Sequence, residues 1–224
     1  PTRVILFGNP TIGTPLMQAN QLAGLDLPQK MLVYQAANDK VFVAYNSPAY
    51  LSARHTGVGA AATIEKLGMA LSGLAKGASM GSITETSSPN AITPSGIVTV
   101  ESKNDFATTY NKLRTAIEGN ANLKIVTELD HQANAKKVGM TLNPTKLIVF
   151  GNPALGSPLM QSAQTIAVDL PQKMLVWETA NGKVNVSYND PGYLANRHGV
   201  MGNEDTIDKI KNALSGLAAG ATEK

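Results

Sequence analysis

The sequence predicts an α+β protein in which a mainly antiparallel sheet carries packed helices, and in which this unit is duplicated. Two observations support the prediction: strand-like alternation is interspersed with helical periodicity, and the chain repeats itself. A shift of 143 positions aligns residues 1–78 with residues 144–221 without a gap, and about 45 of the 78 pairs are identical. Because solenoid repeats are far shorter, a repeat of this length indicates a duplicated domain.

The duplication is incomplete, and this sets the predicted domain organisation. Residues 97–143 precede the second copy, and the first copy has no equivalent segment in this sequence. We therefore expect residues 1–78 to be the C-terminal part of a first repeat that lacks its opening strand, helix and strand. Residues 79–96, rich in Ser, Thr, Pro and Gly, are predicted to be a linker, and residues 97–224 a complete second repeat.

The complete repeat is predicted to open with a strand at residues 97–101 and a helix that Ser102 caps and Gly119 ends. One face of this helix would carry Phe106, Tyr110, Leu113 and Ile117. Alternation predicts a further strand at residues 123–129, and an apolar run predicts another at residues 145–150. Together these segments give a sheet with a helix against it.

The rest of the repeat begins with the motif FGNPALGSPLMQ, which also occurs, slightly changed, in the first copy. Here Ser157 is predicted to cap a helix with Pro158 at its first position, and one apolar face follows at Leu159, Ala163, Ile166 and Ala167. Next, Asn181-Gly182 predicts a hairpin with a type I′ turn. Asn203 is expected to cap the last helix, whose inward residues are Ile207, Ile210, Leu214 and Leu217.

The composition excludes several classes of protein. With 43% hydrophobic and 16% charged residues the chain is globular, and no apolar run is long enough for a bilayer helix. Its net charge of +3 is spread along the sequence, which argues against nucleic-acid binding. The absence of cysteine excludes disulfides, thiolate catalysis and cysteine-based zinc sites. Low charge without cysteine favours an exported protein, periplasmic or extracellular, with the cytoplasm as the alternative.

The phrases FGNP, DLP, YNDP and RH give the chain a specific resemblance. Residues 97–221 resemble the bacterial and archaeal family known as domain of unknown function 302, and residues 1–78 resemble its C-terminal part. The resemblance implies a compact α+β domain of TATA-binding-protein-like topology, often dimeric and sometimes in tandem. It implies no activity, and such a sheet is no reason to propose DNA binding. One departure is Ser47, which stands where the second copy has Asp190.

The three histidines are the side chains best suited to proton transfer or metal binding near neutral pH. His55 and His198 occupy the same repeat position, and His131 follows a predicted strand. One hypothesis gathers His131 and His198 in a ligand pocket with Asn152 and Tyr188. The other makes each histidine a hydrogen-bonded loop residue that fixes a turn, and we favour this second interpretation.

Equivalent positions extend the candidate pocket to both copies. Asn9 matches Asn152, Tyr45 matches Tyr188, and Asn189 lies in the turn YNDPGY. Tyrosines on either side of such an Asn-x-Pro turn can stack a flat ligand, but more often they anchor the turn against a core.

Metal and catalytic sites receive weaker support from the sequence. A metal site needs three or four convergent ligands, and the candidates lack close histidine spacing: His131, His198, Glu128, Asp130 and Asp190. There is no G-x-S-x-G elbow, and GVGAAA does not follow a strand as a dinucleotide loop would. We therefore predict no catalytic residue, no metal and no cofactor.

These observations predict a non-enzymatic, self-associating assembly protein built from two related units. A half-sheet without its covering helix would expose an apolar face and a strand edge, so something must cover residues 1–78. An upstream segment, the other repeat or a neighbouring subunit could do so. The alternative function is a small-ligand-binding domain or weak hydrolase that uses the pocket of histidine, asparagine and tyrosine.

Overall fold

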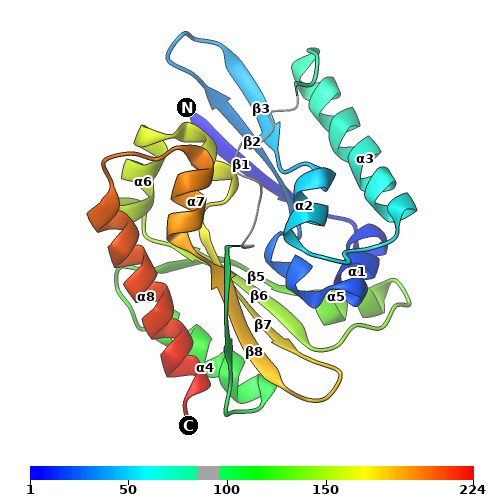
Figure 1. Cartoon of the computed structure of the whole chain (residues 1–224), viewed down its shortest axis with the longest axis vertical. Coiled ribbons are helices and arrows are strands. Elements are labelled where there is room, and N and C mark those ends of the chain that lie inside the picture. The colour runs from blue at the N-terminus through cyan, green and yellow to red at the C-terminus, as the bar shows by residue number, and fades with distance from the viewer. Residues whose placement is uncertain (85–95) are drawn as a thin grey trace.

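The computed structural model describes residues 1–84 and 96–224 and confirms an α+β protein with antiparallel sheets (Figure 1). A three-stranded sheet of order β1-β2-β3 belongs to the first half, and a five-stranded sheet of order β4-β8-β7-β6-β5 to the second. The predicted linker overlaps residues 85–95, which lie outside the described residues. The two sheets correspond to the two predicted units.

The first half contains three strands and the helices that pack on them. In chain order these elements are β1 (Thr2–Phe7), α1 (Pro10–Ala19), the 3-10 helix η1 (Gln21–Leu25), β2 (Gln29–Gln35), β3 (Val41–Tyr45), α2 (Pro48–Arg54) and α3 (Ala61–Ser79). The long helix α3 buries Leu67, Leu71 and Ala75, whose four-residue spacing puts them on one face.

The second half repeats this order and adds the segment that the first half lacks. Its elements are β4 (Ile97–Glu101), α4 (Phe106–Glu118), β5 (Lys124–Asp130), α5 (His131–Lys137), β6 (Thr145–Gly151), α6 (Pro153–Ser162), the 3-10 helix η2 (Gln164–Val168), β7 (Gln172–Glu178), β8 (Val184–Asn189), α7 (Pro191–His198) and α8 (Glu204–Thr222). Strands β4 and β5 occupy the two sheet edges, and α4 packs on β5, β6, β7 and α8.

The main core of the second half lies between its sheet and the helices α4 and α8. Leu113 and Ile117 of α4 are fully buried there, as the helical periodicity predicts. Strand residues such as Ile148 and Val184 face them from the sheet. This packing closes the face of the sheet that the antiparallel alternation makes apolar.

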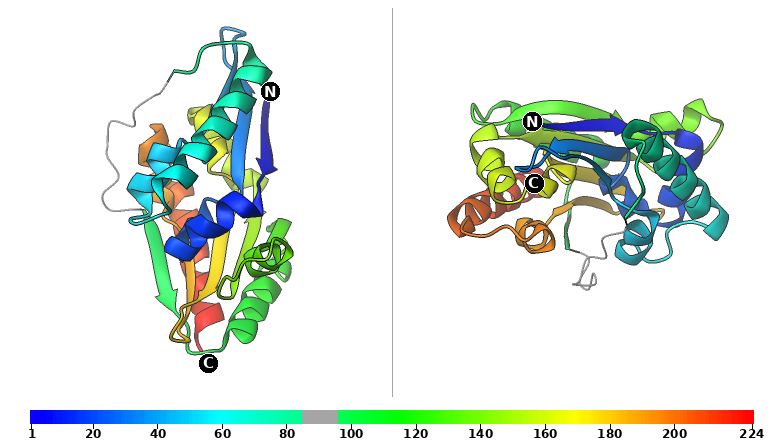
Figure 2. Two further views of the ribbon diagram at one scale, coloured as in Figure 1. Left: turned by 90° about the vertical axis from the view of Figure 1, so that its right-hand side faces the viewer. Right: turned by 90° about the horizontal axis from the view of Figure 1, so that it is seen from above.

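Each half also places its short 3-10 helix against the sheet of the other half. Leu25 of η1 packs with Leu147, Val149 and Leu175 of the second sheet. Ala167 and Val168 of η2 pack with Leu32 of the first sheet. The two sheets therefore lie next to each other with their long helices α3 and α8 on opposite sides, as Figures 1 and 2 show.

Two predicted helix starts and one predicted turn need correction. Helix α6 begins at Pro153 because the side chain of Asn152 accepts a hydrogen bond from Ala154 N at 2.9 Å, so Ser157 is not the cap and Pro158 lies inside the helix. Of two possible start signals, the Asn-Pro pair at the strand end therefore prevails.

The same competition occurs at α4, whose cap is Asp105 and not Ser102. Asp105 accepts from Thr108 N at 2.7 Å, while the Ser102 hydroxyl bonds Thr109 and Asn104.

In the last hairpin only Gly182 has a positive φ, and the loop spans residues 179–183, so the turn is not type I′. The predicted caps Gly119 and Asn203 do flank their helices, although Asn203 makes no side-chain capping bond.

Candidate functional site

A group of polar and charged side chains is buried where the two halves meet, and we call it the interface cluster. Its members are repeat-related pairs: Asp26 and Asp169, Lys30 and Lys173, Asn46 and Asn189, Arg54 and Arg197, His55 and His198. The aspartates follow the 3-10 helices, and the arginines and histidines end the helices α2 and α7. The contacts between the halves thus bring these ten side chains together.

Within each copy the aspartate binds its own arginine and histidine. Arg54 Nη1 donates to both oxygens of Asp26 at 3.0 and 2.9 Å, and His55 Nε2 lies 2.7 Å from Asp26 Oδ2. In the second copy, Arg197 Nη1 and His198 Nε2 lie 2.5 and 2.8 Å from Asp169 Oδ2. Each carboxylate is therefore bound by an arginine and a histidine of its own half.

Contacts between the halves use the asparagines and a lysine. Arg54 Nη2 donates to Asn189 Oδ1 at 2.7 Å, and Arg197 Nη2 donates to Asn46 Oδ1 at the same distance. In addition, Lys173 Nζ lies 3.4 Å from Asp26 Oδ1. These bonds cross between repeats in both directions, so the cluster fixes the orientation of one half on the other.

The charges around the aspartates outweigh the effect of their burial. Burial raises the pKa of Asp26, but Arg54, Lys173 and His55 together hold it well below its usual range. The pKa of Asp169 is lowered in the same way, mainly by Arg197 and His198 against burial. Both aspartates therefore stay ionised near neutral pH and are poorly suited to act as general bases.

Within the described residues, Lys30 differs from its repeat mate in the interface cluster because its charged group is unpaired. Its Nζ is buried and has no hydrogen-bond partner in the described part of the chain. Burial first, and then the charge of Lys173, lower the pKa of Lys30 well below its usual range. Its repeat mate Lys173 has an aspartate beside it, so the two copies have diverged in charge pairing at one position.

The predicted histidines lie in different surroundings. His131 begins α5, while His198 ends α7, and Figure 1 shows these helices well apart. Burial lowers the pKa of His131 to about 4, opposed by a hydrogen bond to the backbone of Gly24 and by Asp130. His198 instead bonds Asp169 and Thr165. The two side chains thus have separate partners, whereas His55 and His198 both enter the interface cluster.

The other predicted site residues divide between caps, core and cluster. Asn9 and Asn152 cap α1 and α6 through their side-chain oxygens. Tyr188 is buried in the core of the second half, and Tyr45 packs against that of the first. Asn189 belongs to the interface cluster, where it accepts from Arg54. Ser47 and Asp190, which differ between the copies, both cap the following helix.

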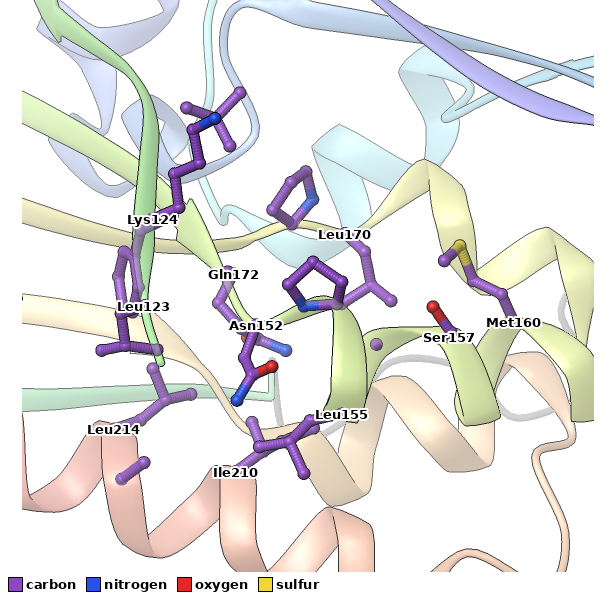
Figure 3. Close-up of a pocket in the computed structure, with 17 residues that line it drawn as sticks. Leu123, Lys124, Asn152, Leu155, Ser157, Met160, Leu170, Gln172, Ile210 and Leu214 are labelled. Carbon is purple, nitrogen blue, oxygen red and sulfur yellow. The ribbon is translucent and has the colours of Figure 1, made fainter. Parts of the chain in front are cut away.

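An apolar cavity of about 280 Å³ lies in the second half beside Asn152 (Figure 3). It is a half-open pocket bordered by the start of α6, the adjacent ends of β5 and β6, and helix α8. Among its apolar lining residues are Leu123, Phe150, Leu155, Met160, Leu170 and Leu214. Of the predicted site residues, only Asn152 lines this cavity.

The sequence reasoning missed the charged partners of the histidines and the cavity. The aspartates stand in the phrase DLPQK, which occurs unchanged in both copies, as does the Arg-His pair. That repetition was a usable signal for Asp26 and Lys30. Across residues 1–84 and 96–224 no group of three His, Cys, Asp or Glu side chains is placed to hold a metal ion, and no helix is long and apolar enough to cross a membrane.

Comparison with known proteins identifies the family. The family model described as "Domain of unknown function DUF302" matches residues 1–74 and 98–217. The chain belongs to the DUF302 family. The two matched segments correspond to the two structural halves, so both repeats are recognisable copies of DUF302 sequence.

A solved DUF302 structure shows the same fold. The crystal structure of an uncharacterized conserved DUF302 protein from Bacillus stearothermophilus superposes with a TM-score of 0.51 and 14% sequence identity. It covers 56% of this chain and 98% of its own, so one unit of the solved protein matches about half of the present one.

Curated relatives match over a similar length. Proteins named Fluoride-specific ion channel FluC 1 from Brucella suis and Brucella abortus are 42% identical over 119 residues. The match covers 53% of this chain, and 46% and 44% of the two relatives. The chain thus spans about half the length of the curated relatives it matches.

Proposed function

We propose that this DUF302 chain is a non-enzymatic assembly protein in which the first half provides a surface for a second copy of the chain. The observation that carries the proposal is a difference between repeat-related residues. Ile5 and Val41 are 56% and 64% exposed, while their counterparts Ile148 and Val184 are 0% and 4% exposed. The same face of the same sheet is therefore open in one half and closed in the other.

The difference arises because α4 has no counterpart in residues 1–84. In the second half α4 covers this sheet face and packs on α8. In the first half the corresponding part of α3 is also open: Ala78 is exposed, whereas its counterpart Ala221 is fully buried. We call Ile5, Val41 and Ala78, with the half-buried Val33 of β2 and Val43 of β3, the open face. The exposed Arg3, which is paired with Val33, lies on the same side of the sheet.

A second copy is a suitable occupant because units of this sequence already pack on one another. Within the chain, each half covers one face of the other's sheet through η1 or η2. That contact covers the opposite side of the first sheet, where Leu32 lies, and leaves Ile5 and Val41 of the open face exposed. Two open faces packed together would bury apolar surface that water otherwise contacts.

The native mass in solution tests this proposal. We expect a particle of twice the 23.5 kDa chain mass, measured by light scattering after size exclusion. The double substitution Ile5→Lys and Val41→Lys should give a monomer, because it places two ammonium groups in the contact at positions that the single chain exposes. Met201→Lys, at an exposed methionine of the second half, should leave the dimer intact. A wild-type monomer at every concentration, or a dimer that survives the double substitution, would refute the proposal.

A further inference from the structure

The apolar cavity beside Asn152 is a half-open pocket, and it is much larger than the voids of a packed protein core. Side chains in cores pack with few voids larger than a water molecule. An engineered apolar cavity of about 150 Å³ in another protein stays dry and binds benzene. At about 280 Å³, with leucine, phenylalanine and methionine in its walls, this pocket presents a mainly apolar surface that a hydrocarbon can cover.

The polar groups of the cavity are few. Figure 3 shows Lys124 extending from the end of β5, and Asn152, Ser157 and Gln172 from the neighbouring segments. Lys124 is the one charged residue of the lining, and no carboxylate contributes to it. A ligand with an anionic end is therefore favoured over a cationic one.

The volume indicates how long an apolar chain the pocket can hold. Because a water molecule occupies about 30 Å³ in the liquid, the cavity has the volume of roughly nine waters, or a chain of about eight to ten carbons. We propose that this cavity binds the aliphatic chain of a medium-chain carboxylic acid, with the carboxylate beside Lys124. The site belongs to the second half, so it does not depend on association through the open face.

Three ligands that share a ten-carbon chain and differ in the charge of the head group test the charge preference. Calorimetric titration and thermal unfolding with decanoate, decanol and decylammonium, all below their micelle-forming concentrations, should give the tightest binding and largest stabilisation for decanoate. Lys124→Gln should weaken decanoate binding several-fold and leave decanol binding unchanged. No binding of decanoate, or equal affinity for decanoate and decylammonium, would overturn the proposal.

The repeat supplies a matched test of the location. Ala213 lines the cavity from α8, and Ala70 is its counterpart on α3; both are exposed, so a larger side chain can be accommodated. Ala213→Trp should lower decanoate affinity at least tenfold by filling the cavity, while Ala70→Trp should leave it unchanged. Unaltered binding by the Ala213 variant, or an equal loss in both variants, would show that decanoate binds elsewhere and refute the site.

Discussion

At the scale of single residues, the sequence identifies several side chains that are important in the structure. It does not reveal the contacts that these side chains make. The sequence indicates Asn9 and Asn152 as candidate ligand-binding residues, and in the structure each caps a helix. His55 and His198 were expected to make hydrogen bonds that fix a turn, and both bond a buried aspartate. That aspartate lies 29 residues earlier in the chain, and only the tertiary fold brings the groups together.

The buried ion pair of Asp26 leads to a stability prediction. Asp26→Asn should lower the free energy of unfolding at pH 7 by about 3–5 kcal/mol, because Arg54 would stay buried without a carboxylate. Since the folded-state pKa of Asp26 lies well below its unfolded value, its contribution is present above about pH 4 and is lost as the pH falls further. The variant should therefore lose less stability than the wild type on acidification. Urea denaturation between pH 7 and pH 2 measures both effects.

Asp39→Asn is the control for this experiment, because Asp39 is an exposed carboxylate of the same half. Its effect at pH 7 should stay within about 0.5 kcal/mol. If Asp26→Asn cost no more than this control, the interface cluster would not contribute to stability as its geometry indicates.

At the scale of elements, the strands and the long helices were predictable because their apolar periods are local. The face of α4 that carries Leu113 and Ile117 is an example, since both residues are fully buried. The starts of α4 and α6 were misplaced where two capping residues compete within a few positions, as Ser102 and Asp105 do. Neither 3-10 helix is predicted as a separate element, because five residues are too few to show a period. The sequence predicts that the apolar face of α6 continues to Ile166 and Ala167, but α6 ends at Ser162 and these two residues belong to η2.

The 3-10 helix η1 should nevertheless be important for stability. Leu25 is fully buried against Leu147, Val149 and Leu175 of the other half. Leu25→Ala should lower the free energy of unfolding by about 2–5 kcal/mol, because it removes apolar contact and leaves a cavity between the halves. Leu74→Ala, at an exposed position of α3, should cost less than about 1 kcal/mol. Equal losses in chemical denaturation would contradict the role assigned to η1.

At the scale of the whole molecule, the duplication was visible in the sequence, but the arrangement of the copies was not. Three ways to cover residues 1–78 were open, and the structure shows that the second half covers the side on which Leu32 lies. In residues 1–84 and 96–224, Ile5 and Val41 of the open face stay exposed. Pairwise identity between repeats could not reveal this, because it records shared residues and not which surfaces meet.

The second half shows what would close the open face, and this leads to a last prediction. Fusing an extra copy of residues 97–143 directly ahead of Pro1 reproduces the order of the complete repeat. The added helix should then cover Ile5 and Val41 as α4 covers Ile148 and Val184. Burial of two such aliphatic side chains contributes roughly 1.5–3 kcal/mol each, so the extended chain should be several kcal/mol more stable. It should also be monomeric, because the surface proposed for a second copy is occupied.

The matched control carries Leu113→Asp and Ile117→Asp in the added copy alone, so that its helix presents charge to the open face. Because these two positions are fully buried in the natural α4, the altered segment should not dock, and the chain should keep the stability and oligomeric state of the unextended protein. Denaturant titration measures the stability, and light scattering the oligomeric state, of the unextended protein and of the two extended proteins. If both extensions raised stability equally, or if the unaltered extension left a dimer, the open face would not be the surface through which copies of this chain associate.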